Sequence, residues 1–253
     1  MTPYYSDDTS TLYCGDCLDV IRHLPNESFD AAVTDPPFML GAASARKSAD
    51  KVIGWADINN ASHWYSAWMG EAWRTLRPHG CLWIFANWRS LPVLQCAASR
   101  VPGMSILSHV VWDKQWVSVG SMRGVREQCE LIVLLGKPEF AIPDRAAGNI
   151  WPEKWTSQRP SGHPQEKPVP LIARMLEASD LRPGARVFDG FMGRGSTGVA
   201  CAEASMRFVG VEMESHHVEV ARDRIVAARP TQEGLFALAS PAAGGGAGRE
   251  GGT

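Results

Sequence analysis

Apolar runs alternate with segments of helical spacing between residues 12 and 228. The runs predict strands at 12–14, 31–34, 81–86, 106–112, 130–135, 186–188 and 208–211. Helical spacing predicts helices at 61–75, 91–99, 167–178, 197–204 and 216–228, the first of them ended by the Pro and Gly of LRPHG at 76–80. Several runs are apolar throughout, as is typical of parallel strands covered on both faces. The pattern predicts a doubly wound α/β fold in which the runs at 106–112 and 130–135, with no helix between them, pair antiparallel.

One domain is expected over residues 1–240. Two long segments without a clear period, near 39–62 and 136–165, are expected to be loops that recognise the substrate, since long loops in compact domains are usually functional. Residues 241–253 are rich in glycine and poor in apolar surface, so a disordered tail is expected there.

Composition excludes few function classes. No run reaches the roughly 18 apolar residues of a membrane helix, and the N-terminus does not resemble a secretory signal, so a cytoplasmic protein with no membrane partner is expected. Six scattered cysteines, two of them in a Cys14-x-x-Cys17 pair, are expected to be reduced and to bind no metal. The net charge of −2 gives no global sign of nucleic-acid binding. Clustered basic residues in predicted loops are nevertheless candidate phosphate contacts: Arg46, Lys47, Lys51, Lys114, Arg123, Arg126 and Arg159.

Residues 186–198 read as a strand, a glycine-rich turn and the start of a helix. Gly193 and Gly195 allow a ligand to approach the backbone closely, and the helix that follows presents unpaired N–H groups. Asp189 ends this strand, and Glu212 ends the next one, where an acid can accept the ribose hydroxyls of an adenosine. The glycines also fit G-x-G-x-x-G, which leaves a dinucleotide site open, although an acid at the turn would repel a pyrophosphate.

Asp35-Pro36-Pro37-Phe38 follows the apolar run at 31–34 directly. Ligands of open α/β sheets bind beyond the carboxyl ends of strands, so this tetrapeptide is a candidate catalytic segment. The prolines fix φ and leave carbonyls free to accept hydrogen bonds, the Asp adds a further acceptor, and the Phe offers a flat face for stacking. Alone, the tetrapeptide is equally compatible with a rigid turn.

The tetrapeptide resembles the catalytic D-P-P-[YFW] motif of amino-group DNA methyltransferases, and residues 188–198 resemble their cofactor motif. The catalytic motif comes first, as in the β-class, a circular permutation of the methyltransferase sheet. CGDC at 14–17, VVWDK at 110–114, HPQEKP at 163–168 and VGVEM at 209–213 resemble further motifs of this class. The resemblance implies a Rossmann-like, mostly parallel seven-stranded sheet with one antiparallel strand, S-adenosyl-L-methionine as cofactor, and double-stranded DNA as partner.

The resemblance further implies that a base leaves the duplex and that its amino nitrogen attacks the donor methyl group in line, while Asp35 and the Pro36 carbonyl accept its N–H bonds. Catalytic roles fall to Asp35, Pro36, Pro37 and Phe38. Where the family usually has Pro, Ser and Thr, this chain has Gly190, Arg194 and Ser196, and the large Arg194 puts cofactor affinity in doubt. The implied cofactor contacts are Asp16, Cys17, Asp35, Lys167, Asp189, Gly190, Phe191, Gly193, Arg194, Gly195, Ser196, Thr197 and Glu212.

Within the family, Asp rather than Ser at position 35 favours N6 of adenine, so site-specific adenine methylation of DNA, as in restriction–modification, is the expected function. N4-cytosine methylation is the alternative, and a nicotinamide-dependent oxidoreductase or a catalytically inactive DNA-binding module are the candidates from other classes. C5-cytosine methylation is discounted because no Cys follows a Pro. Homodimerisation is expected of so small a relative. Trp64, Trp68 and Trp73 are expected in the core or a dimer interface, and Trp116, Trp151 and Trp155 are candidate DNA contacts.

Overall fold

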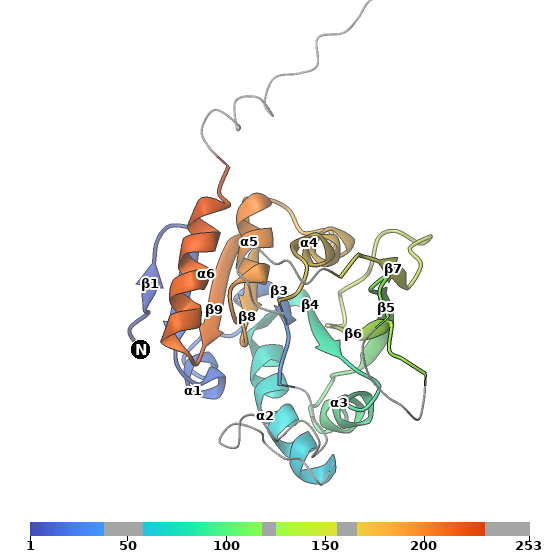
Figure 1. The fold of residues 1–253 in the computed structure, drawn as a ribbon. Helices are drawn as coiled ribbons and strands as arrows, with labels where there is room; N and C mark the ends of the chain where they lie inside the picture. Colours follow the sequence, from blue (N-terminus) through green and yellow to red (C-terminus); the bar gives the residue numbers. More distant parts are fainter. Residues whose placement is uncertain (38–57, 118–124, 156–165, 231–253) are drawn as a thin grey trace, which may run out of the picture.

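The computed structural model describes residues 1–37, 58–117, 125–155 and 166–230, whose strands form one nine-stranded sheet (Figure 1). The sheet order is β1-β2-β9-β8-β3-β4-β6-β5-β7. The strands are β1 Tyr5–Ser6, β2 Ser10–Cys14, β3 Phe29–Thr34, β4 Leu76–Ala86, β5 Ile106–Asp113, β6 Cys129–Gly136, β7 Ile150–Pro152, β8 Arg186–Asp189 and β9 Arg207–Glu212. The helices are α1 Cys17–Ile21, α2 Ile58–Thr75, α3 Leu91–Ala98, α4 Val169–Ala178, α5 Ser196–Glu203 and α6 Ser215–Ala227.

The sheet is parallel from β2 through β9, β8 and β3 to β4. β6 is antiparallel to both of its neighbours, β4 and β5, which confirms the predicted doubly wound class and the predicted antiparallel pairing. The strand number was underestimated, because the two-residue β1 and the three-residue β7 extend the sheet at its edges. Strands that short carry no readable periodicity.

Helices cover both faces of the sheet (Figure 1). α1, α2 and α3 pack in one apolar cluster, and α4, α5 and α6 pack in the other. Between the two layers, all six residues of β3 are buried. This double coverage explains why consecutive residues of the strand, such as Ala31, Ala32 and Val33, are apolar and do not alternate with polar ones.

The main differences from the expected elements concern the predicted loops and the start of β4. α2 begins at Ile58, so the predicted loop near 39–62 ends earlier, and β7 interrupts the predicted loop at 136–165. α2 does end at Thr75, but LRPHG opens β4 instead of forming a connection, because Leu76 pairs at once with Phe29 of β3. The predicted tail, 241–253, lies outside the described residues. No helix in the described ranges has the length and hydropathy that a membrane crossing requires.

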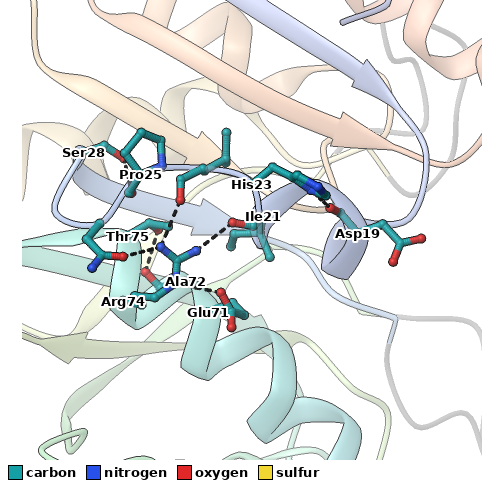
Figure 2. A network of polar contacts seen from close by, with 11 residues as sticks. Asp19, Ile21, His23, Pro25, Ser28, Glu71, Ala72, Arg74 and Thr75 are labelled. Carbon is teal, nitrogen blue, oxygen red and sulfur yellow. Dashed lines mark hydrogen bonds and ion pairs between the residues drawn. The ribbon is translucent and has the colours of Figure 1, made fainter. Parts of the chain in front are cut away.

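Short helix α1 was not predicted, and tertiary hydrogen bonds hold it in place (Figure 2). Asp16 caps its first turn by accepting from the Leu18 amide at 2.8 Å. At the other end, Arg74 of α2 donates to the carbonyls of Ile21 and Leu24, both at 2.9 Å, and so satisfies acceptors that a helix end leaves open. Residues 14–17 are thereby fixed beside the carboxyl end of β9.

Candidate active site

The carboxyl ends of β3 and β8 lie side by side at one edge of the sheet, because these strands pair in parallel with Ala32 opposite Phe188. At the strand ends, the Thr34 hydroxyl donates to Oδ1 of Asp189 at 2.8 Å. The Asp-Pro-Pro segment and the glycine-rich turn therefore emerge as neighbours, although most of the chain lies between them.

Asp189 organises the glycine-rich turn. Its Oδ2 accepts from the Thr197 hydroxyl at 2.7 Å, and its Oδ1 accepts from the Phe191 amide at 3.0 Å as well as from Thr34. The residue is only 3% exposed, and burial raises the pKa of its carboxyl to about 6. Because both oxygens already accept hydrogen bonds within the chain, the geometry supports a role in shaping the turn; direct contact with a ligand stays a prediction.

A hydrogen bond from α2 fixes the position of the Asp-Pro-Pro segment. Pro36 is buried and Pro37 is exposed, and the Pro37 carbonyl accepts from the hydroxyl of the fully buried Tyr65 at 2.8 Å. Two fixed φ angles and this hydrogen bond restrict the segment. Phe38 lies outside the described residues, so its stacking role stays a prediction.

The Asp35 carboxylate has two unequal oxygens. Oδ2 lies 3.3 Å from the Lys167 ammonium, whereas Oδ1 is buried and has no hydrogen-bond partner among the described residues. Burial raises the pKa of Asp35 to about 6 against the opposing effect of Lys167. Since a buried acceptor left unpaired costs about 1–3 kcal/mol, this site suits a ligand that supplies an N–H donor.

Gly193 presents open backbone at the turn. Its φ is +52°, a conformation that favours glycine, and no atom lies within 4 Å of the position that a Cβ would take. Its amide donates to Oε2 of Glu212 at 3.1 Å, and Oε1 of that residue accepts from the Glu214 amide at 2.8 Å. The acid at the end of β9 is thus tied to the turn, with uncrowded space above Gly193 for a ligand.

The other two glycines of the G-x-G-x-x-G match pack α5 against α6. A Cβ at Gly195 would lie 2.8 Å from Cβ of Ala221, and a Cβ at Gly198 would lie 2.3 Å from Cδ1 of Ile225. Helix packing alone therefore accounts for these two positions. The match does not require a pyrophosphate, which weakens the dinucleotide alternative.

Gly190 and Cys17 occupy one space. A Cβ at Gly190 would lie 2.6 Å from the Cys17 sulfur, which is buried beneath it. This contact gives a steric reason for glycine where the resembling family usually has proline. Cys17 therefore supports the turn by packing, and burial raises the pKa of its thiol. The exposed Asp16 beside it remains the candidate ligand of this segment.

Arg224 of α6 connects the turn to the segment before α4. Its guanidinium donates to the Arg194 carbonyl at 2.5 Å and pairs with the buried Glu166. The Glu166 carboxylate belongs to the HPQEKP motif, so one side chain joins two motifs that the sequence shows separately. Phe191, also in the turn, packs on Trp64 and Trp68 at ring-centroid distances of 5.8 and 5.4 Å.

Three contributors to the site escaped sequence analysis. Glu130 pairs with Lys167 at 2.8 Å, and a charged residue near the start of an apolar strand was the signal that could have revealed it. Thr34 could have been suspected from its place beside the motif. Tyr65 had no signal, because an aromatic residue at helical spacing is typical of the core.

The predicted DNA contacts are only partly described. Lys114 is largely buried and paired with Glu130 at 2.5 Å, which argues against a phosphate contact, whereas Arg126 is exposed. Trp68 and Trp73 are buried in the core as expected. Trp151 was wrongly considered for DNA contact: it is 4% exposed, with the Arg174 guanidinium over its ring. Outside the described residues lie Arg46, Lys47, Lys51, Arg123 and Arg159.

Exposed aromatic side chains follow β4 and β5 at the same sheet edge as Asp35. Trp88 is 61% exposed and has the Arg89 guanidinium 4.5 Å from its ring centroid. Trp116 stacks on Trp155 with centroids 4.6 Å apart and remains partly exposed. Sequence analysis did not single out Trp88. Flat rings beside guanidinium groups suit contact with nucleobases and phosphates.

Comparison with known proteins gives a consistent result. Residues 29–223 match the N6/N4 family described as "DNA methylase". The putative methylase YubD of Escherichia coli (strain K12) is 28% identical over 221 residues, which cover 87% of this chain and 92% of that protein.

Solved structures share the fold. The complex of M1.HpyAVI with SAM matches with a TM-score of 0.63 at 19% identity, over 85% of this chain and 99% of that one. PvuII DNA methyltransferase, described as cytosine-N4-specific, matches with a TM-score of 0.72 at 19% identity, over 93% of each chain. These likenesses establish the Rossmann-like methyltransferase architecture.

Proposed function

The chain belongs to the N6/N4 family of DNA methylases, and on this premise we propose that it transfers a methyl group from S-adenosyl-L-methionine to N6 of adenine in double-stranded DNA. The observation that carries the proposal is that β3 and β8 are adjacent. The hydrogen bond from Thr34 to Asp189 joins their carboxyl ends. This adjacency places the Asp35 carboxylate, to which we assign binding of the amino group, next to the glycine-rich turn and its open backbone at Gly193.

The residues at the turn fit the proposed cofactor. Open space over Gly193, the exposed carboxylate of Asp16 and the tethered carboxylate of Glu212 offer a backbone surface and acceptors for an amino group and ribose hydroxyls. When bound, S-adenosyl-L-methionine supplies a sulfonium methyl whose carbon bonds to the base nitrogen as its bond to sulfur breaks, and the nitrogen then loses a proton.

Asp35 performs the substrate side of the reaction. Its Oδ1, which has no hydrogen-bond partner among the described residues, accepts one N–H of the base, and the Pro36 carbonyl accepts the other. This favours a tetrahedral nitrogen with a lone pair directed at the methyl carbon. Tyr65, by holding the Pro37 carbonyl, keeps these acceptors in place. Fixed orientation of this kind supplies a large share of catalytic acceleration.

N4 of cytosine is the second candidate. The same two acceptors serve either exocyclic amino group, and PvuII DNA methyltransferase, described as cytosine-N4-specific, shares the fold. Asp at position 35 favours adenine. For the DNA itself, we assign contacts to Trp88 with Arg89, to Trp116 and to Arg126, all at or near the edge of the sheet that carries Asp35.

The decisive experiment expresses the full chain in a host without DNA methylation and measures modified nucleosides by mass spectrometry. N6-methyladenine that disappears in the Asp35→Ala strain supports the proposal, and N4-methylcytosine selects the second candidate. In parallel, calorimetry compares S-adenosyl-L-methionine with NAD. Saturable binding of NAD alone, with unmodified DNA, contradicts the proposal.

A further inference from the structure

Four charged side chains of alternating sign form a partly buried row beyond the ends of the central strands. Lys114 Nζ lies 2.5 Å from Glu130 Oε1, Glu130 Oε2 lies 2.8 Å from Lys167 Nζ, and Lys167 Nζ lies 3.3 Å from Asp35 Oδ2. The four residues come from separate places: the end of β5, β6, the segment before α4, and the end of β3. Their side chains are 10–29% exposed, so water screens these interactions little.

Aromatic rings line the row. Lys167 Nζ lies 4.9 Å from the Phe85 ring centroid and 6.0 Å from that of Trp112, and Lys114 Nζ lies 5.3 Å from Trp112. An ammonium placed among rings is partly desolvated and needs anions nearby. The carboxylates of Glu130 and Asp35 meet that need on two sides of Lys167. Its position is therefore strongly constrained.

This constraint acts on Asp35. An ammonium at Oδ2 fixes which carboxylate oxygen is occupied, and it leaves Oδ1 as the acceptor without a partner among the described residues. Without the ammonium, the carboxylate could rotate about its Cβ–Cγ bond, and an acceptor oxygen would no longer keep the direction that Oδ1 has here. A fixed, ionised carboxylate is what the proposed methyl transfer requires.

We propose that Lys167 is the positioning residue of Asp35, and that Glu130, with Lys114 behind it, holds Lys167 in place. The inference rests on the proposed function and deepens it. It assigns Lys167 to the substrate side of the site, where sequence analysis had expected a cofactor contact. Lys167 touches neither reacting atom in this role; it acts through Asp35.

The titratable groups that face Asp35 predict the direction in which its pKa should move in each variant. They are Lys167, Lys114 and Glu130 in the row, Asp189 on β8 and the Tyr65 hydroxyl on α2. Burial raises the pKa of Asp35, Lys167 and Lys114 lower it, and Glu130 raises it. Removing Lys167's charge should therefore raise the pKa of Asp35. Removing Glu130's charge while keeping an acceptor for Lys167, as Glu130→Gln does, should lower it.

The experiment measures the Asp35 pKa directly, by carbon-13 NMR titration of aspartate-labelled full chain, with Asp35→Asn to assign the signal. Lys167→Met should raise the pKa by about one unit or more, and Glu130→Gln should lower it, while Lys167→Arg should stay near the wild type. The acid limb of kcat should move in the same directions. Affinity for S-adenosyl-L-methionine should change by less than about threefold in all three variants.

Lys137→Met is the matched control. This lysine also lies over an aromatic ring, 4.9 Å from the Trp73 centroid, but it follows the opposite end of β6. It should leave the Asp35 pKa unchanged. Loss of cofactor affinity in Lys167→Met with no change in that pKa would overturn the inference and make Lys167 a cofactor ligand.

An Asp35 pKa that falls in Lys167→Met would also overturn the inference. If Lys167→Met does not fold, the conservative variants Lys167→Arg and Glu130→Gln still test the inference. An Asp35 pKa that does not move in Glu130→Gln contradicts the proposed row. Failure of the proposed function is a separate result: wild-type chain that modifies no DNA. The NMR titration reads the Asp35 pKa in either case.

Discussion

The hydroxyl of Thr34 donates to the carboxylate of Asp189 at 2.8 Å, and this hydrogen bond joins the last residue of β3 to the last residue of β8. The proposed substrate side and the proposed cofactor side of the site thus share one buried contact. A substitution at either residue should therefore affect both sides of the proposed site.

Replacing Thr34 tests this joint. Thr34→Val keeps the shape and removes the donor, so we expect the free energy of unfolding to fall by about 1–3 kcal/mol and cofactor affinity to weaken. Thr34→Ser, which keeps the hydroxyl, should lie close to the wild type. Chemical denaturation and calorimetry provide the measurements. Equal behaviour of the two variants would show that the hydroxyl contributes nothing.

Substitution of Asp35 should reduce the rate of methyl transfer and leave cofactor binding nearly unchanged. In Asp35→Ala we expect kcat to fall by about 100-fold or more, because an oriented acceptor is lost, while affinity for S-adenosyl-L-methionine changes little. Methylation assays under saturating DNA and calorimetry of the cofactor complex give the two numbers. If both fall together, the Asp-Pro-Pro segment is structural.

Stability and activity should respond to pH in opposite directions. Burial raises the pKa of Asp35 and of Asp189 to about 6, above their ordinary value, so both carboxyls favour the folded state when protonated. Between pH 7 and pH 5 each should add about 1 kcal/mol to the free energy of unfolding. Methyl transfer, which needs ionised Asp35, should fall in the same interval.

Asp35→Asn supplies the control for this pH dependence. It should remove one share of the stability gain and leave the share of Asp189. Urea denaturation at pH 5, 6 and 7, with kcat measured alongside, makes the comparison. A wild-type stability that decreases steadily from pH 7 to pH 5 would contradict these pKa values.

Gly190 and Cys17 should behave as a coupled pair. Gly190→Ala drives a methyl group to 2.6 Å from the Cys17 sulfur, so we expect a loss of about 1–3 kcal/mol of stability. The double variant with Cys17→Gly should recover part of this loss, which a double-mutant cycle in urea would quantify. Additive effects would mean that the two residues do not share the space.

The exposed ring of Trp88 should contribute to DNA binding. Trp88→Ala removes a surface on which a base can stack, which is worth about 1–3 kcal/mol, so we expect affinity for DNA to fall about tenfold. Tyr4→Ala, at an exposed aromatic residue before β1, is the control. Fluorescence anisotropy with labelled duplex measures both. Equal affinities would remove Trp88 from the proposed contact surface.

Sequence patterns predicted long elements well and side-chain partnerships poorly. The strand β3 could be predicted from its apolar residues, because both of its faces are covered. The glycine-rich turn could be predicted from Asp189 and the glycines that follow it. The link between Lys167 and Glu130 was not readable, because no periodicity records which loops meet in space. Helix α1 depends on Arg74, from another helix, so its five residues carried too little local signal.

The position of β2 has a consequence for synthesis of the chain. This strand pairs along its whole length with β9, the last strand among the described residues, and within those residues its other partner is the two-residue β1. β2 therefore gains its main partner only after β9 has been made, and Asp16 cannot take its place beside Glu212 before that point. Until β9 has been made, a nascent chain that already carries Asp35 therefore lacks one side of the proposed cofactor site, so we expect no methyl transfer before that point.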